Sequence, residues 1–229
     1  MPSIYSSSGD GWAQGAQEST FASGRMHSGA ASDNNNVRDT YTVIVESLSG
    51  KGGGETHFTR RAFFFFDTSG ISIAPSEATL KIKGFSRNNS DVIAVKSTAA
   101  DPVVNGSYND FPTDAVTALG NSDGSGAGTF AGISGLTYSA ELATWSTSGY
   151  NDIELNSTAL SDMASLDVLK VCVMDYDYDY LDIAPSIGTL VGVGGYWQNS
   201  GGTGNDPYID YTEGVASVAH NAPFFGTNF

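Results

Sequence analysis

Short runs of alternating apolar and polar residues recur along this chain, and each is bounded by Gly, Asn, Asp or Ser. Such period-two runs are typical of half-buried β-strands. The clearest covers residues 78–84, where Leu80 and Ile82 alternate with Thr79, Lys81 and Lys83. The predicted strands lie at residues 41–48, 57–66, 78–84, 91–96, 137–142, 150–156, 168–174, 190–197 and 206–212.

Helical signals are few. One helical turn is predicted at residues 113–119, and the best short helix covers residues 157–163, with Asn156 or Ser157 as its N-cap. The many strands and the single short helix predict an all-β fold, an antiparallel β-sandwich (jelly roll).

The central stretch covers residues 57–69 and contains four consecutive phenylalanines, Phe63, Phe64, Phe65 and Phe66. Successive side chains of a strand point to opposite faces, so both faces of this strand are apolar. We therefore expect it to be central and covered on both sides. One cover is the opposite sheet. The other is either the chain itself, through residues 1–36 or 101–136, or another molecule, in which case the four rings form an interface.

The chain divides into an N-terminal arm at residues 1–36, a β-sandwich domain at 37–213 and a C-terminal tail at 214–229. The arm is polar and rich in Gly and Ser. The tail carries Phe224, Phe225 and Phe229, which is unusual because disordered tails are normally polar. Two interpretations remain open: the tail docks on a neighbouring molecule and drives assembly, or it folds back over its own sandwich.

The charge composition limits the classes of partner that the chain can bind. The 229 residues include 10 basic and 25 acidic side chains, for a net charge of −15 at pH 7. This charge excludes bulk attraction to nucleic acid or to an anionic membrane. The lone cysteine, Cys172, lies in an apolar run and is predicted to be a core residue rather than part of a disulfide framework.

An acidic and aromatic segment at residues 175–182 is the most distinctive candidate for chemistry. In an extended chain Asp175, Asp177 and Asp179 share one face, and three carboxylates at this spacing form a candidate calcium site. Two alternatives remain: a solvated acidic strand end, and a surface on which tyrosines contact a glycan or a partner protein. The candidate glycan contacts are Tyr176, Tyr178, Tyr180, Trp145 and Trp197.

Signs of catalysis are absent from the sequence. His27, His57 and His220 stand in unrelated contexts, and the chain has neither a nucleophile elbow nor a Walker loop. We expect a non-catalytic protein without a resident cofactor, calcium being the one candidate.

The order of segments resembles that of the DNRLRE-type β-sandwich family. The resemblance covers residues 8–213: an early Asp-Gly pair, the Arg-Ala-Phe-Phe-Phe-Phe-Asp-Thr-Ser strand and a closing Asp-Pro-Tyr-Ile-Asp-Tyr-Thr strand. Arg61, Asp67, Pro207 and Tyr208 match the family's motif positions. The segment at 175–182 and the tail after Glu213 depart from the family pattern, which puts a carried-over ligand site in doubt there.

The resemblance implies a jelly roll similar to carbohydrate-binding modules and found in bacterial surface proteins and phage virions. The N-terminus shows no secretion signal, which fits a protein made in the cytoplasm and released by lysis. We therefore expect a structural virion protein of a bacteriophage, a capsid decoration or tail-associated component that contacts other virion proteins and forms a homo-oligomer. The alternatives are a carbohydrate-binding module that attaches to host surface glycans and, third, a polysaccharide-cleaving enzyme.

Overall fold

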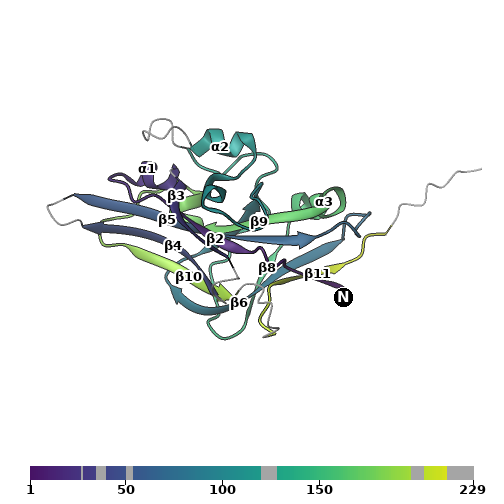
Figure 1. Cartoon of the computed structure of the whole chain (residues 1–229). Helices are drawn as coiled ribbons and strands as arrows, with labels where there is room; N and C mark the ends of the chain where they lie inside the picture. The colour runs from purple at the N-terminus through teal and green to yellow at the C-terminus, as the bar shows by residue number, and fades with distance from the viewer. Residues whose placement is uncertain (27, 35–39, 50–53, 120–127, 197–203, 216–229) are drawn as a thin grey trace, which may run out of the picture.

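The computed structural model describes residues 1–26, 28–34, 40–49, 54–119, 128–196 and 204–215. The described chain is an all-β antiparallel sandwich, as predicted, and its sheets are joined through one long strand (Figure 1). None of the helices in these ranges is long and apolar enough to cross a membrane.

The lower sheet in Figure 1, here called sheet A, has four strands in the order β1, β11, β6, β8. Along β6, Leu80 and Ile82 point into the sandwich and are fully buried, whereas Lys81 and Lys83 point outward. The strand bounds are β1 Ser3–Tyr5, β6 Glu77–Asn88, β8 Tyr150–Glu154 and β11 Tyr208–Thr212.

The second sheet, sheet B, is built around β5, Glu55–Asp67. One edge of β5 pairs first with β4 and then with β9, and the other edge pairs with β2. Strands β10, β3 and β7 extend the sheet beyond β4, β2 and β9. The bounds are β2 Gly11–Gly15, β3 Ser28–Asn34, β4 Thr40–Ser49, β7 Val92–Lys96, β9 Val168–Asp175 and β10 Leu190–Tyr196.

Strand β6 belongs to both sheets. Its first half pairs with β8 and β11, and its second half pairs with β10, where the register shifts between Gly194 and Gly195. A strand that passes from one sheet to the next forms a corner of the sandwich.

The helices are few and short. The predicted helix forms as α3, Ser157–Ser165, and the side chain of Asn156 caps it by accepting hydrogen bonds from the backbone N–H groups of Thr158 and Ala159. The predicted helical turn at 113–119 forms as α2. The other helical segments are α1 Phe21–Met26, a 3-10 helix η1 Asn105–Asn109 and a π-helical turn η2 Tyr176–Tyr180.

Two hydrophobic cores lie on the two faces of β5. Ala62, Phe64 and Phe66 point toward sheet A and join the first core. Phe63 and Phe65 point to the opposite face and join a second core. The second core takes its other side chains from β7, β9, β2, α1 and η2, and above all from the connection between residues 99 and 136, which includes η1 and α2. This connection forms a third layer (Figure 1).

The burial of the four phenylalanines contradicts the interface prediction for Phe63, Phe64, Phe65 and Phe66. Each of these side chains is at most 1% exposed, because the chain supplies both covers. Of the alternatives left open by the sequence, the connection at 101–136 is the main cover, and α1 from residues 1–36 contributes Met26 and Arg25 to the same face. Cys172, which pairs with Phe63 across β5 and β9, is a buried free thiol of the second core, as predicted.

Residues near the N-terminus contribute strands to the sandwich. Strand β2 pairs with β5 over Gly11–Gln14, and isolated bridges extend the contact from Ser6, opposite Phe66, to Glu18, opposite His57. The segment that the sequence analysis described as an arm thus supplies the neighbour along one whole edge of β5.

Candidate functional site

The acidic and aromatic segment follows β9 and does not continue it as an extended chain. Residues 176–180 form the π-helical turn η2, and Asp175 caps it by accepting a 2.8 Å hydrogen bond from the backbone N–H of Tyr178. π-helical turns are rare and occur frequently at functional sites. The turn separates side chains that an extended strand would place on one face.

Asp179 lies inside the protein and binds Arg61. The guanidinium of Arg61 donates from Nε to Oδ2 and from Nη2 to Oδ1 of Asp179, both at 2.6 Å. Both side chains are at most 1% exposed. Two parallel hydrogen bonds between a guanidinium and a carboxylate are the strongest arrangement for such a pair.

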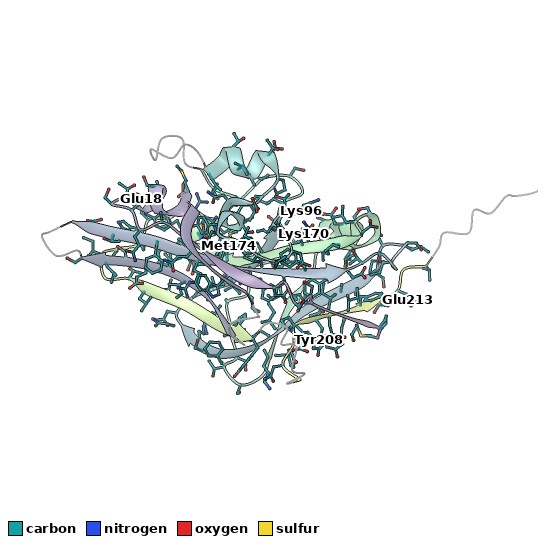
Figure 2. All side chains as sticks on the ribbon, viewed as in Figure 1. Glu18, Lys96, Lys170, Met174, Tyr208 and Glu213 are labelled. Atoms are coloured by element: carbon teal, nitrogen blue, oxygen red, sulfur yellow. The ribbon has the colours of Figure 1, made fainter. Side chains whose placement is uncertain are left out.

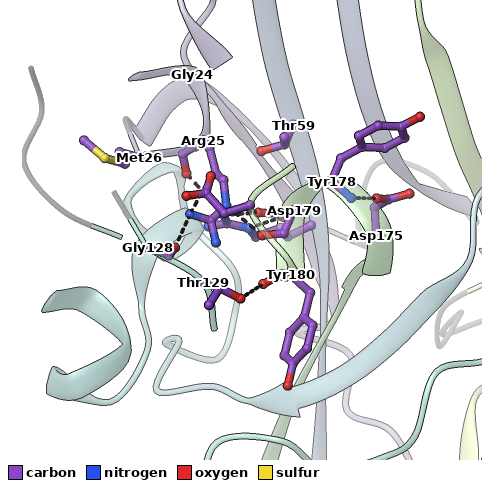
Figure 3. Close-up of polar contacts among 12 residues, drawn as sticks. Gly24, Arg25, Met26, Thr59, Gly128, Thr129, Asp175, Tyr178, Asp179 and Tyr180 are labelled. Atoms are coloured by element: carbon purple, nitrogen blue, oxygen red, sulfur yellow. Dashed lines mark hydrogen bonds and ion pairs between the residues drawn. The ribbon is translucent and has the colours of Figure 1, made fainter. Parts of the chain in front are cut away.

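A second buried arginine, Arg25 of α1, shares this carboxylate. Its Nε lies 3.3 Å from Oδ1 of Asp179 and donates at 2.6 Å to the carbonyl oxygen of the same residue (Figure 3). Its Nη1 donates to the carbonyl of Gly128 at 2.8 Å and lies 3.4 Å from Asp182. Two arginines thus face two aspartates, so the formal charges of this cluster cancel.

The position of Arg25 depends on a close approach of α1 to β5. A Cβ atom on Gly24 would lie 2.5 Å from the carbonyl oxygen of His57, so glycine is required at this point. The carbonyl of Arg25 accepts from Nη2 of Arg61 at 3.1 Å and from the hydroxyl of Tyr108 at 3.1 Å.

Aromatic rings enclose the arginines. The guanidinium carbon of Arg61 lies 4.1 Å from the ring centre of Tyr108 and 5.3 Å from that of Phe111, and that of Arg25 lies 4.9 Å from Phe130. Cations over ring faces are attracted by the ring quadrupole. Burial raises the pKa of Tyr108 to about 12, so its hydroxyl remains protonated and bonds to Thr59 and Arg25.

The two arginines feel the shared carboxylate differently. Burial by itself lowers the pKa of Arg61, but the charge and hydrogen bonds of Asp179 outweigh it, so the pKa lies above its ordinary value. Burial lowers the pKa of Arg25, and the nearby positive charge of Arg61 lowers it further. Asp179 raises this pKa, but it contacts Arg25 less closely than it contacts Arg61, so the pKa stays below its ordinary value. Arginine nevertheless stays protonated in proteins, so both remain cations.

The cluster joins five parts of the chain: α1, β5, η1, η2 and the segment at 128–130. Arg61 adds bonds to the carbonyl of Tyr108 at 2.9 Å and to Oδ1 of Asn109 at 3.2 Å. These hydrogen bonds and ion pairs attach the third layer to sheet B. We call Arg25, Arg61, Asp179 and Asp182 the buried charge cluster.

The geometry on which the calcium prediction depended is absent. Asp175 accepts from Ser90 and Tyr178, Asp179 is held by arginines, and Asp177 is exposed. Within the described ranges, no group of three or more His, Cys, Asp or Glu side chains gathers in a metal-binding arrangement. The prediction that the three aspartates share one face is therefore wrong, because η2 replaces the extended strand.

Asp175 has an unusual protonation equilibrium. Burial raises its pKa to about 6, although the hydrogen bonds from Tyr178 N–H and the Ser90 hydroxyl favour the ionised form, and the charges of Asp179 and Asp177 add to the rise. The ordinary value is about 3.9, so the folded chain binds this proton more tightly than the unfolded chain. The stabilising contribution is complete below about pH 4 and is lost as the pH rises through 6.

This linkage predicts the behaviour of Asp175→Asn. We compare the free energy of unfolding of the unmodified chain with that of the variant. The difference between them falls by on the order of 2–3 kcal/mol between pH 4 and pH 7 and stays constant above pH 7. Urea unfolding of both proteins at unit pH steps measures this difference. Parallel pH profiles for the two proteins would contradict the assignment.

The candidate glycan contacts in this segment do not form one platform. Tyr180 is only 5% exposed and its hydroxyl bonds to Thr137 at 2.7 Å. Tyr176 stacks on Tyr180 and packs on the second core, whereas Tyr178 packs on a third cluster with Phe21 and Val191. Figure 3 shows Tyr178 and Tyr180 pointing in different directions.

The tryptophans and the tail phenylalanines complete the candidate residues. Trp145 is buried, and its indole N–H donates to the carbonyl of Gly194 at 3.2 Å. Trp197, Phe224, Phe225 and Phe229 lie outside the described residues. Among the histidines, His57 is buried beside Glu55, with 3.1 Å between Nε2 and Oε2; His27 and His220 also lie outside the described ranges.

Sequence reasoning missed Arg25, Tyr108 and Phe130 as members of this site. Arg25 lies in a polar segment, and its helix reads Phe-Ala-Ser-Gly-Arg-Met, without a helical apolar pattern. One signal was available: Arg61 and Phe63 share a strand face, so a buried cation needed an acidic partner.

The sequence matches no protein-family model and no curated protein.

Proposed function

We propose that the chain is a non-catalytic structural component of a bacteriophage virion, a capsid decoration or tail-associated β-sandwich. The observation that carries the non-catalytic part is the closure of the buried charge cluster. Arg25, Arg61 and Asp179 are at most 1% exposed, and the carboxylate of Asp179 is bound by both guanidinium groups. Such groups brace the fold and do not meet a substrate.

Two further observations support the virion setting. The order of segments resembles that of DNRLRE-type sandwiches, which occur in virions. The net charge of −15 opposes unspecific association between copies, so assembly has to proceed through defined contacts. The proposal thus places this chain among other virion proteins, in a homo-oligomer.

Quantitative mass spectrometry of purified virions tests this proposal. We expect peptides of this chain in density-purified particles, at a constant ratio to the major capsid protein across independent preparations. Detection of the peptides in the lysate but not in the particles would contradict the proposal. A hydrolase assay on the purified chain, with polysaccharide substrates and reducing-end detection, should give no turnover.

Assembly is predicted to depend on the C-terminal tail. The described body ends at Val215, after β11, and among the described residues beyond Ile209 only Tyr211 packs on a core. Burying one phenylalanine is worth about 1.5–3 kcal/mol, so three rings supply several kcal/mol of docking energy. Removing the tail, residues 214–229, should leave the melting temperature within a few degrees and convert the oligomer to a monomer.

Native mass spectrometry and light scattering measure this change. The matched control is the full-length triple variant Phe224→Ser, Phe225→Ser, Phe229→Ser, which should also be monomeric. An oligomer that persists in both proteins would rule out the tail as the assembly element.

A further inference from the structure

The outward face of sheet A carries three tyrosines that lie outside the buried charge cluster. In the register of this sheet, Tyr5 of β1 stands opposite Tyr208 of β11, which stands opposite Lys81 of β6. Tyr150 of β8 stands opposite Lys83. The neighbouring inward positions Ile209 and Leu80 are fully buried, so the tyrosines point away from the core. We call Tyr5, Tyr208 and Tyr150 the tyrosine face.

The ring of Tyr208 contacts the rings of both Tyr5 and Tyr150. The centroids of Tyr5 and Tyr208 are 5.5 Å apart with an interplanar angle of 41°, and those of Tyr208 and Tyr150 are 5.2 Å apart at 69°. Tyr5 is 60% exposed. Figure 2 shows Tyr208 on the lower sheet, away from Lys96 and Lys170 on the other side of the molecule. The outermost ring thus offers a face to solvent, and its neighbours support it.

Polar side chains flank the rings. Lys81 donates to Asp152 at 2.8 Å, and Lys83 donates to Oδ1 of Asn205 at 2.7 Å. Asp210 accepts from Ser3 at 2.5 Å. Carboxylates and amide oxygens accept several hydrogen bonds, and an ammonium donates three, so each of these pairs retains hydrogen-bonding capacity.

A hollow beside β8 extends this surface. It has a volume of about 490 Å³ and is lined by Tyr150 and Asp152, together with Arg87, Thr144 and Ser146 among others. Tyr150 and Asp152 therefore belong both to the sheet face and to the hollow. The volume lies within the range of small-molecule sites.

The chemistry of the face identifies its occupant. Within sheet A, the outward positions of β6, β8 and β11 hold no aliphatic side chain; they are Glu77, Thr79, Lys81, Lys83, Tyr150, Asp152, Glu154, Tyr208, Asp210 and Thr212. Cores of protein interfaces are depleted of charge, so a protein partner fits this face poorly. A net charge of −15 disfavours an anionic polymer. A sugar ring combines an apolar C–H face with hydroxyl groups, which matches exposed tyrosines among carboxylate, amide and ammonium groups.

We propose that the tyrosine face, with Lys81, Asp152 and the hollow beside β8, is a binding site for a neutral polysaccharide. Tyr5 stacks on a sugar ring, and Asp152 and Asn205 accept hydrogen bonds from hydroxyl groups. This site replaces the one predicted at residues 176–180. It is independent of the virion assignment, because the isolated chain carries it whether or not the chain is part of a particle.

The test uses the full-length chain and three soluble neutral polysaccharides, a β-glucan, a mannan and a galactan. Isothermal titration and affinity electrophoresis measure binding to each. We expect at least one to bind, Tyr5→Ala to weaken that binding by about tenfold, and the double variant Tyr5→Ala, Asp152→Ala to abolish it. Tyr5→Phe keeps the ring and should bind within about threefold of the unmodified chain.

Leu48→Ala is the control for an exposed position on the other sheet, where the side chain is 42% exposed, and it should leave binding unchanged. Melting curves test whether the Tyr5→Ala variant is folded, and we expect that it is because the side chain of Tyr5 is exposed. The proposal is overturned if none of the three neutral polysaccharides binds, if Tyr5→Ala binds like the unmodified chain, or if a sulfated glucan competes more strongly than the neutral ones. It is equally overturned if Tyr5→Ala changes the oligomeric state, because the face would then belong to a second copy of the chain.

Discussion

Replacing Asp179 with asparagine is expected to lower the free energy of unfolding by about 3–5 kcal/mol, because it leaves two buried arginines without their shared counter-ion. Both guanidinium groups are fully buried, and both hydrogen bonds from Arg61 to the carboxylate are 2.6 Å long. In a chain of this size, 1 kcal/mol shifts the melting temperature by about 2–4 °C, so we expect a loss of roughly 10 °C. Urea unfolding and calorimetry measure both quantities.

Asp177→Asn is the matched control for this substitution. Asp177 lies two residues away in the same π-helical turn but is exposed, so the variant should change stability by no more than about 0.5 kcal/mol. Arg61→Lys keeps the charge but not the bidentate fork, and should be clearly destabilising. Similar small effects for Asp179→Asn and Asp177→Asn would show that the cluster does not brace the fold.

Phe65→Ala should cost about 3–5 kcal/mol, as much as Phe64→Ala, although the two rings point to opposite faces of β5. Phe64 packs in the first core between the sheets, and Phe65 in the second core under the connection at 99–136. Each ring is at most 1% exposed. Equal costs are expected because each deletion leaves a cavity in a closed core.

Chemical denaturation of the isolated chain, at a concentration too low for assembly, measures these costs. Val116→Ala serves as the control: this α2 residue of the covering layer is 42% exposed and should change little. A cost below 1 kcal/mol for Phe65→Ala beside a large cost for Phe64→Ala would mean that the second face is not stably covered by the chain itself.

Strands could be predicted where local pattern and burial agree. The alternation around Leu80 and Ile82 predicted β6, and the carboxylate of Asp67 accepts from Ser69 N–H at 3.0 Å in the turn after β5, as the Asp-Thr-Ser-Gly sequence indicates. The strand expected at 137–142 forms only isolated bridges, from Thr137 to Val95, from Ser139 to Leu155 and from Leu142 to Val92. Whether these residues form a regular strand depends on pairing with a segment distant in the sequence, and the local pattern carries no information about that pairing.

The cover of β5 shows the same limit. The four phenylalanines indicate that both faces are covered, but nothing in them distinguishes a layer of the same chain from a second molecule. The covering segment has no regular period, since it contributes single residues such as Val103, Phe111 and Phe130 from irregular backbone.

The sequence predicted where the candidate site lies but not what its residues do. The segment at 175–182 does concentrate acidic chemistry, yet Asp179 bonds with Arg25, which is 154 positions away in the sequence. A backbone that coils into a π-helical turn rotates alternate residues apart, so period-two reasoning placed Asp175, Asp177 and Asp179 together when the fold separates them.

The pairing of β1 with β11 has a consequence for synthesis and folding. Ser3 and Asp210 are bonded across 207 positions, so β1 has no paired strand until almost all of the described chain has left the ribosome. Pairings of such sequence separation make folding slow. Tyr5 and Tyr208 come together only when β1 pairs with β11, so a nascent or truncated chain that lacks β11 does not display the tyrosine face.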